Sequence, residues 1–468
     1  MTAYPAATLG EPGVRALQRG LLAQQAGETD RAIECYRAAL RQHPGLAPAH
    51  FNLGQLLRER GNYREAAACF EGAARLRPTA TDAWLNLGAM LELLDRHRDA
   101  VAAYQRASAC SPDDVAPLYN RGNALLALGE LAGAAAAYQA VVELDPGHVG
   151  ANWNLSTTQL AAADFQSGWR QYEWRWAKAG IDPKGKYPWP LWAGEPLAGK
   201  RIVVWREQGL GDEILFATCL RELVASGAEV TLMASARLVS LLQRAFPSIE
   251  VLADGAKIGG QVDVHAPIGG LPRYVRQSRT SFPSQGRFLV PDSAVATRWT
   301  ARLDRLPAGP RVGISWRSGL ATEQRQRHYS SLEAWGPLFK LPSIQLINLQ
   351  YDECAAELEA AEDRFGIKIH RWRSENLKDD LETAVALMWN LDAVVTAPTA
   401  VSSLAGGVGV PTWQVDSGSD WTAHGQDRSP WFPTVRVVRR PFGSVAWEPV
   451  LERIAADLSS LLPGLPPS

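Results

Sequence analysis

The 468-residue sequence predicts an α-helical superhelix built from repeats, followed by an α/β module with two halves. The first observation behind this is a 34-residue period in the first third of the chain. The second is an alternation of short β-branched runs with amphipathic stretches, which begins at Arg201. A chain of this length exceeds one ordinary core, and we expect several structural units. The predicted boundaries are 1–178 for the repeats, 179–200 for a linker, 201–305 for the first half, and 306–468 for the second half with a C-terminal helix.

The composition limits the classes of partner. Forty-eight basic residues stand against forty-nine acidic ones, so no overall charge favours nucleic acid or an anionic membrane. Five cysteines lie far apart without a C-x-x-C pair, which indicates a reducing compartment and argues against a disulfide framework or a zinc cluster. The sequence opens without a basic and apolar leader, and it contains no apolar run long enough to cross a bilayer. We therefore expect a soluble, cytoplasmic protein.

The repeating unit is predicted to be a pair of helices joined by a short turn. A small alanine lets the two helices approach, an aromatic residue fills the groove between units, and a proline closes the second helix. Each of these positions recurs every 34 residues. The series are Ala32, Ala66, Ala100 and Ala134; Tyr36, Phe70, Tyr104, Tyr138 and Tyr172; Pro44, Pro78, Pro112 and Pro146; and the turns at Gly27, Gly61, Asp95 and Gly129.

This pattern resembles the tetratricopeptide repeat. Because one unit cannot bury its own faces, the units stack into a superhelix whose concave surface is expected to dock a peptide or protein. Asn52, Asn86 and Asn120 recur at the same step on the first helix of each unit. They either hydrogen-bond the backbone of a bound acceptor or bridge helices inside the array. The units are expected at 14–47, 48–81, 82–115 and 116–149, with a diverged fifth unit from 150 to about 178.

Beyond the repeats, the sequence predicts a linker and two sheets. Proline, glycine and tryptophan dominate Gly180–Lys200 and predict an ordered linker. After it, strands and helices alternate as in a parallel sheet. Two such Rossmann-like halves face each other across a cleft at the carboxyl ends of their strands. The expected strands are RIVVW, EVTLMA, IEVL, RVGISW, IQLINLQ, IKIHRW, DAVVTA and PTWQV, and the expected helices lie near 213–226, 236–245, 331–340, 353–365, 380–390 and 400–408.

Five motifs together resemble the bacterial tetratricopeptide glycosyltransferases: EQGLGDEILFA, PLWAGEPLAGK, VGISW, DAVVTAPTAVSSLAGGVGVPTW and DRSPWFPTVRVVRR. The catalytic part of those enzymes is similar to the heptosyltransferase-like glycosyltransferases with the GT-B fold. The resemblance implies inverting transfer of a sugar from a nucleotide donor, bound mainly by the second half, to an acceptor on the first half. Some members of the group modify flagellin with nonulosonic acid sugars. A protein acceptor recruited by the repeats, with flagellin as one candidate, is therefore expected.

The run WREQGLGDEILFA places two glycines and two adjacent acids where the first strand turns into a helix. Gly209 and Gly211 permit a sharp turn and the close approach of a ligand to the backbone. By its place in the resembling enzymes, Asp212 is the candidate general base that takes the proton of the acceptor hydroxyl. Acids at helix starts are also favoured by capping and by the helix dipole, so a structural role stays open. Glu213 and Glu207 are weaker candidates.

The phosphates of a donor need cations or backbone N–H groups. Since the sequence contains no Asp-X-Asp triplet, we expect a metal-independent reaction. Arg317 and Arg327 lie in the loop after a strand of the second half and are the candidate cations. Gln350 ends another strand and is a candidate to meet the base or the ribose. Solvent exposure is the alternative for the arginines, and capping is the alternative for Gln350.

The segment TAPTAVSSLAGGVG is expected to open a helix at Thr399, whose exposed N–H groups suit a pyrophosphate. Related enzymes carry an acid and a histidine in this segment, where this chain has Ala397 or Pro398 and Ser403. These departures keep a second interpretation open, a non-catalytic adaptor with a degenerate transferase module. A third is a transferase for lipid-linked or polysaccharide acceptors. The candidate donor-binding residues of the segment are Thr399, Ser402, Ser403 and Gly406.

Overall fold

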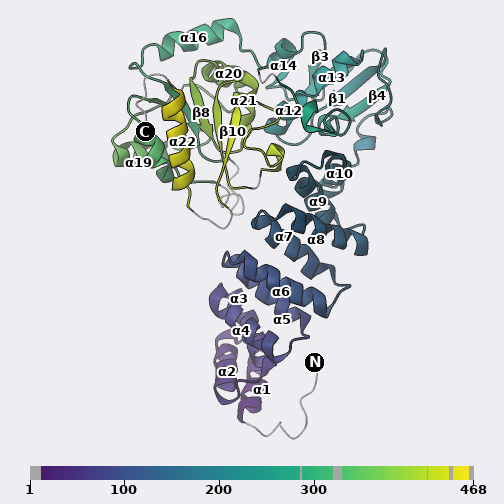
Figure 1. The fold of residues 1–468 in the computed structure, drawn as a ribbon, viewed down its shortest axis with the longest axis vertical. Coiled ribbons are helices and arrows are strands. Elements are labelled where there is room, and N and C mark those ends of the chain that lie inside the picture. The colour runs from purple at the N-terminus through teal and green to yellow at the C-terminus, as the bar shows by residue number, and fades with distance from the viewer. Residues whose placement is uncertain are drawn as a thin grey trace. The chain divides into compact units, whose positions relative to one another are not determined.

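A computed structural model describes residues 12–284, 287–319, 329–372, 374–418, 420–441 and 446–462 (Figure 1). The chain divides into two compact units, Met1–Thr158 and Gln159–Ser468. Arg327, one of the two candidate phosphate-binding cations, lies outside the described residues. Among the residues described, no helix is both long enough and apolar enough to cross a membrane.

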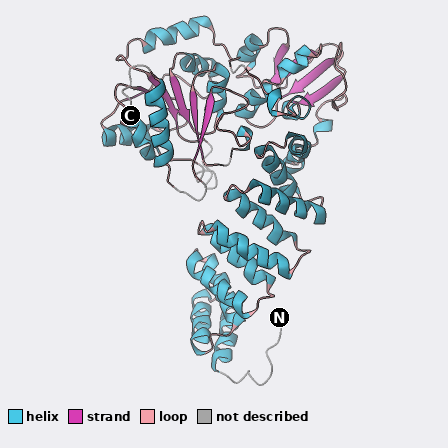
Figure 2. Cartoon of the chain, viewed as in Figure 1, coloured by secondary structure: helices cyan, strands magenta, loops and turns pink. Residues whose placement is uncertain are grey.

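The first unit consists of helix pairs, as the 34-residue period predicts (Figure 2). In each tight turn one residue adopts a left-handed backbone, at Gly27, Gly61 and Gly129 with φ of 74–75° and at Asp95 with φ of 56°. Glycine adopts this conformation without a steric penalty, and aspartate is among the few other residues that tolerate it. The helices are α1 (Pro12–Gln25), α2 (Thr29–Gln42), α3 (Ala47–Glu59), α4 (Tyr63–Leu76), α5 (Thr81–Leu93), α6 (His97–Cys110), α7 (Val115–Ala127), α8 (Leu131–Leu144) and α9 (Val149–Ala161).

Small residues bring the two helices of each pair close together. A Cβ atom added to Gly88 in α5 would lie 2.4 Å from a ring carbon of Tyr104 in α6, and one added to Gly122 in α7 would lie 2.5 Å from Tyr138 in α8. Close-packed interiors hold no contacts that short, so the aromatic ring fills the space inside its own pair and not, as expected from the sequence, the groove between units. The repeated alanines and aromatics are completely buried: Ala32, Ala66, Ala100, Ala134, Tyr36, Phe70, Tyr104 and Tyr138.

The second unit begins around a four-stranded parallel sheet. Its strand order is β3-β2-β1-β4, with Ile202 of β1 in register with Val230 of β2 and Val264 of β4. The helix expected at 213–226 is divided into α12 and α13. β4 is not predicted from the sequence. The elements are β1 (Arg201–Trp205), α12 (Leu210–Ala217), α13 (Leu220–Ala225), β2 (Glu229–Ala234), α14 (Val239–Ala245), β3 (Glu250–Ala253), β4 (Val264–Pro267) and α15 (Pro272–Val275).

A second, six-stranded parallel sheet follows, in the order β10-β9-β8-β5-β6-β7. Counted from β5, this is the 3-2-1-4-5-6 order of doubly wound folds, in which the direction of winding reverses between β5 and β8. β10 is not predicted from the sequence. The elements are α16 (Ser293–Leu303), β5 (Arg311–Ser315), α18 (Gly336–Phe339), β6 (Gln345–Asn348), α19 (Ala355–Phe365), β7 (Ile369–His370), α20 (Leu381–Trp389), β8 (Ala393–Thr396), α21 (Ala400–Val408), β9 (Thr412–Asp416), β10 (Val435–Arg439) and α22 (Glu448–Leu461).

The segment after α9 differs from the sequence-based expectation. The period assigns residues up to about 178 to a fifth repeat, but the chain divides after Thr158 and the segment belongs to the second unit. It forms α10 (Phe165–Gln171), η2 (Tyr172–Trp174) and α11 (Arg175–Ala179), which we call the strap. Trp169 and Tyr172 are almost fully buried, and the Trp169 indole N–H donates to the Arg276 backbone oxygen at 2.9 Å. Burial of these large rings against the α/β module explains the change of unit.

The linker Gly180–Lys200 is ordered along the first sheet, as its composition predicts. The Trp192 backbone N–H donates to the His265 backbone oxygen at 2.8 Å, and Leu191 forms a parallel bridge with the same residue of β4. The Trp192 indole is buried. These contacts extend the edge of the sheet beyond β4.

Candidate functional site

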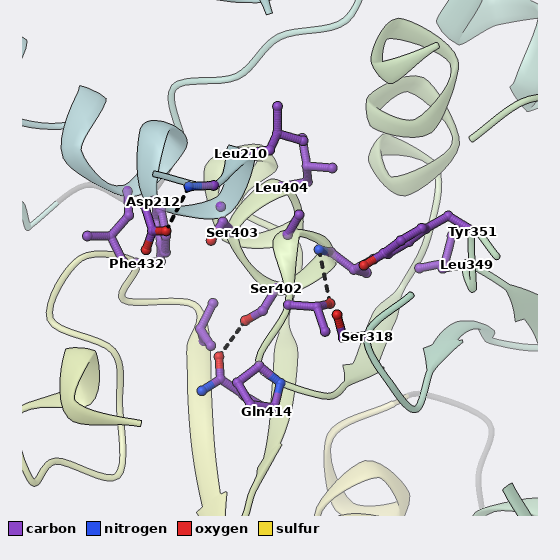
Figure 3. Close-up of a pocket in the computed structure, with 18 of the residues that line it drawn as sticks. Leu210, Asp212, Ser318, Leu349, Tyr351, Ser402, Ser403, Leu404, Gln414 and Phe432 are labelled. Carbon is purple, nitrogen blue, oxygen red and sulfur yellow. Dashed lines mark hydrogen bonds between the residues drawn. The ribbon is translucent and has the colours of Figure 1, made fainter. Parts of the chain in front are cut away.

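A cavity of about 860 Å³ lies within the second unit, where the carboxyl ends of strands from both sheets meet (Figure 3). The segments that follow β1, β5, β6, β8 and β9 build its wall. The strand order reverses beside β1 and beside β5, and open α/β sheets bind their ligands at such points. The volume also suits a small-molecule ligand. The polar residues on the wall include Gln208, Asp212, Arg237, Ser318, Tyr329, Tyr351, Lys378, Thr399, Ser402, Ser403, Gln414, Asp420 and Thr422.

Asp212 lines this cavity from the first turn of α12. Its Oδ2 accepts a hydrogen bond from the Gly209 backbone N–H at 3.2 Å, so the carboxylate also caps the helix. Burial raises the pKa of Asp212 to about 6; the Gly209 N–H lowers it, and the nearby carboxylates of Glu207 and Asp420 raise it. A carboxyl group with this pKa exchanges its proton near neutral pH, as a general base requires.

The two other acids of the run have structural partners. Glu213 is completely buried and accepts from the Arg206 Nε at 3.0 Å. Glu207 is buried and accepts two hydrogen bonds from the Arg175 guanidinium, at 2.8 and 3.1 Å. Of the three acids, Asp212 is the one that lines the cavity.

The start of α21 adjoins α12 on the cavity wall. Thr399 caps α21 with its side chain, and the Ser402 hydroxyl donates to Gln414 Oε1 at 2.6 Å (Figure 3). A Cβ atom added to Gly211 would lie 3.3 Å from the Ser403 hydroxyl, so the two helix starts are in near contact. Backbone N–H groups in the first turn of a helix and the positive end of its dipole favour anions. This part of the wall therefore suits phosphate oxygens.

Arg317 does not reach the cavity. Its guanidinium pairs with Asp352 and Glu357, and its Nε lies 3.3 Å from Glu357 Oε2. The expectation that Arg317 binds phosphate is corrected for this reason: the loop after β6 brings two carboxylates against the charge. Within the described part of the chain, the basic residues on the cavity wall are Arg237, after β2, and Lys378, before α20. No sequence motif marks either residue.

Two further candidates for the donor site are also placed elsewhere. Gln350 is buried, and its Oε1 accepts from the Ser315 hydroxyl at 3.0 Å and from the Trp316 backbone N–H at 3.1 Å. It ties β5 to β6 and is not on the cavity wall. A Cβ atom added to Gly406 would lie 2.5 Å from the Phe432 ring, so this glycine serves helix packing.

An apolar region of the cavity was not predicted. Leu381, Ala384 and Met388 of α20 line it together with Leu349, which follows β6. Tyr351 lies in the same region (Figure 3). A flat, partly apolar ligand such as a nucleobase fits a wall of this kind. Leu349 and Tyr351 flank Gln350 just after β6, so the carboxyl end of this parallel strand is the signal for these two residues. No sequence motif marks the residues of α20.

The repeated asparagines make contacts inside the array. Asn86 accepts from Arg58 Nη1 at 2.7 Å and donates to the Asp82 backbone oxygen at 2.8 Å. Asn52 is partly buried on α3, and Asn120 is partly buried on α7. For Asn86 these contacts favour the internal, bridging role over direct binding of an acceptor.

Comparison with known proteins identifies the repeats of the first unit. A family model described as the tetratricopeptide repeat matches residues 17–63, 51–115, 95–149 and 119–167. The N-terminal region carries tetratricopeptide repeats. Proteins with such repeats form extended concave surfaces that bind peptides or proteins. Among solved structures, the chain is similar to YrrB, described as a repeat protein with an unusual peptide-binding site (25% identity, TM-score 0.33, 35% of this chain and 85% of that one), and to MamA from Desulfovibrio magneticus RS-1 (18%, 0.33, 38% and 99%).

A curated relative extends beyond the repeats. Protein FlbA of Caulobacter vibrioides is 35% identical over 322 residues, which cover 65% of this chain and 54% of FlbA. The chain thus spans about half the length of that relative. Because the first unit ends at Thr158, the alignment necessarily includes part of the second unit.

Proposed function

We propose that the second unit is a glycosyltransferase with a GT-B arrangement, which moves a sugar from a nucleotide donor to a protein acceptor recruited by the repeats. The cavity carries this proposal, because it joins an acid with a pKa of about 6 to an anion-attracting helix start at the carboxyl ends of two parallel sheets. Support for a protein acceptor comes from the repeats. Flagellin is the acceptor that the family resemblance suggests.

In the proposed reaction Asp212 takes the proton of the acceptor hydroxyl as the oxygen attacks the sugar. The bond from the sugar to the donor phosphate breaks from the opposite side, so the anomeric configuration inverts. The leaving phosphates lie at the start of α21, near Arg237 and Lys378. The base lies in the apolar region beside Met388. Backbone N–H groups and basic side chains serve in place of a metal in this scheme.

A second candidate function is that of a repeat-based adaptor. It is favoured by the pairing of Arg317 with two carboxylates, which leaves Arg237 and Lys378 as the basic side chains on the cavity wall among the residues that the structure describes. The transferase proposal is preferred because Asp212 keeps both a place on the wall and a pKa near neutrality.

A panel of UDP-, GDP-, ADP- and CMP-sugars separates the two functions. We expect one donor to raise the melting temperature and to label a protein acceptor, with transfer unaffected by EDTA. Asp212→Asn is expected to lower turnover by about 10²–10⁴-fold with donor affinity unchanged. Asp292→Asn is the matched control, since Asp292 caps α16 by accepting from Ala294 N–H at 2.9 Å, away from the cavity. Failure of every donor to bind supports the adaptor, and labelling of a lipid or glycan alone excludes a protein acceptor.

A further inference from the structure

The strap places the last member of the repeated aromatic series beside the cavity. In the array, tyrosine hydroxyls of this series donate to a side chain on the preceding helix of their own pair. Tyr172 stands 34 residues after Tyr138, yet its hydroxyl has a partner from a different part of the chain. The Gln208 Nε2 donates to the Tyr172 hydroxyl at 2.9 Å. The array pairs are Tyr36–Gln24 at 2.6 Å, Tyr104–Glu92 at 2.5 Å and Tyr138–Asn123 at 2.8 Å.

Gln208 is held in an unusual conformation at the cavity wall. Its φ is 59°, in the left-handed region that non-glycine residues adopt at a cost of about 1 kcal/mol or more. The next residue is Gly209, whose backbone N–H donates to Asp212. The conformation of Gln208 therefore sets the direction of the N–H group that orients the carboxylate. An interaction that fixes Gln208 also fixes this contact.

The strap also holds the residue before Gln208. The Arg175 guanidinium donates to both oxygens of Glu207, and both side chains are buried. The Tyr172 ring is itself immobilised, because it packs edge-on against Trp169 with 5.5 Å between ring centres and lies 5.3 Å from Trp421. In the loop after β1, Glu207 and Gln208 are thus hydrogen-bonded by two side chains of the strap. These are Arg175 and Tyr172.

We propose that Tyr172 is a positioning residue for Asp212, acting through Gln208 to hold the loop after β1 in the conformation that turns the carboxylate toward the cavity. This rests on the proposed transferase function for its catalytic consequence. The last tyrosine of the repeat pattern thereby supports the candidate site from outside the cavity wall.

Tyr172→Phe tests the proposal, because it keeps the buried ring and removes the hydroxyl. Loss of one hydrogen bond is expected to lower kcat by about five- to tenfold, with the KM for the donor within about twofold of the wild-type value. A weakened Gly209 contact also raises the pKa of Asp212, so the acid limb of the pH–rate profile moves to higher pH. The matched control is Tyr138→Phe, which removes a hydroxyl at the same repeat position and is expected to leave kcat and the profile unchanged.

A second background tests the route through Gln208. Glycine adopts a positive φ without strain, so Gln208→Gly keeps the turn while removing the side chain that Tyr172 binds. In this background Tyr172→Phe is expected to have no further effect on kcat. An added loss of the same size as in the wild type overturns the route, and an unchanged kcat and pH profile for Tyr172→Phe alone overturn the proposal.

Hydrogen exchange of the full-length protein separates this proposal from the proposed function. In Tyr172→Phe, peptides that contain residues 207–212 are expected to exchange about five- to tenfold faster than in the wild type, whereas Tyr138→Phe leaves them unchanged. This readout needs no donor or acceptor. If the wild type transfers no sugar, the proposed function fails, while faster exchange still supports the positioning contact; unchanged exchange overturns it.

Discussion

Asp212→Asn is expected to stabilise the second unit at alkaline pH. The carboxylate is partly buried beside Glu207 and Asp420, and these surroundings hold its pKa at about 6, above the ordinary value of 3.8. An ionised Asp212 is therefore a cost to the folded state. Asparagine has the same size and keeps an oxygen that accepts from the Gly209 N–H, so it removes the charge with little other change.

The size and the pH window follow from the two pKa values. Because the folded-state pKa is the higher one, the folded state binds more protons than the unfolded state between pH 3.8 and about 6. Stability contributed by the protonated form is complete below pH 3.8 and is lost as pH rises through 6. The full difference is about 3 kcal/mol, and screening by solvent at a partly exposed group reduces it to about 1–3 kcal/mol. The free energy of unfolding of Asp212→Asn should exceed that of the wild type by this amount at pH 8 and by about half of it at pH 5.

Urea denaturation followed by tryptophan fluorescence measures the effect. Of the 17 tryptophans, Trp84 and Trp153 lie in the first unit and the other fifteen in the second, so the signal reports chiefly on the second unit. Asp292→Asn provides a control at a half-buried helix cap outside the cavity, where no gain is expected. If Asp212→Asn is no more stable than the wild type at pH 8, burial does not raise the pKa of Asp212. The proposed role of Asp212 as general base would then lose its main support.

Two further predictions concern packing and thiol reactivity. Gly88→Ala places a Cβ atom 2.4 Å from Tyr104 and should destabilise the array by about 1–2 kcal/mol net of helix propensity. Gly133→Ala places its Cβ atom 3.4 Å from the nearest side-chain atom and should stabilise the array by up to about 1 kcal/mol. Urea denaturation followed by circular dichroism measures both free energies of unfolding, and equal effects of the two changes refute the prediction. Burial raises the pKa of Cys219 to about 12 and those of Cys69 and Cys354 to about 11. A thiol reagent at pH 8 should therefore label two cysteines in the native chain, Cys35 and Cys110, and fast labelling of a third would contradict the fold.

The missed strands show where local sequence signals end. β4 and β10 lie at the edges of their sheets, and both break the continuous apolar run that marks buried strands. His265 lies within β4, and Arg436 alternates with valines in β10. Pairing with a neighbouring strand, rather than the composition of the segment, makes each of them a strand. The central strands β1, β5 and β8 were predicted because both of their faces are apolar.

The candidate donor-site residues likewise divide into those with a local sequence signal and those whose role depends on distant residues. Thr399, Ser402 and Ser403 were found because a strand-to-helix turn is visible in the sequence and its position in a parallel sheet is general. The role of Arg317 depended on Asp352 and Glu357, 35 and 40 residues further along the chain. Such an ion pair forms only when β5 and β6 lie side by side, and the sequence carries no sign of it.

The sequence by itself determined the elements whose cause is local: the 34-residue period, the left-handed turns, the central strands and the helix start that carries Asp212. Only the tertiary structure decided which side chains meet. It moved the strap into the second unit, paired Arg317 with carboxylates, and directed the Tyr172 hydroxyl to Gln208, 36 residues away. The physical reason is that propensity and hydrophobic period act over a few turns of chain, whereas burial, ion pairing and hydrogen bonding depend on neighbours that are brought together by folding.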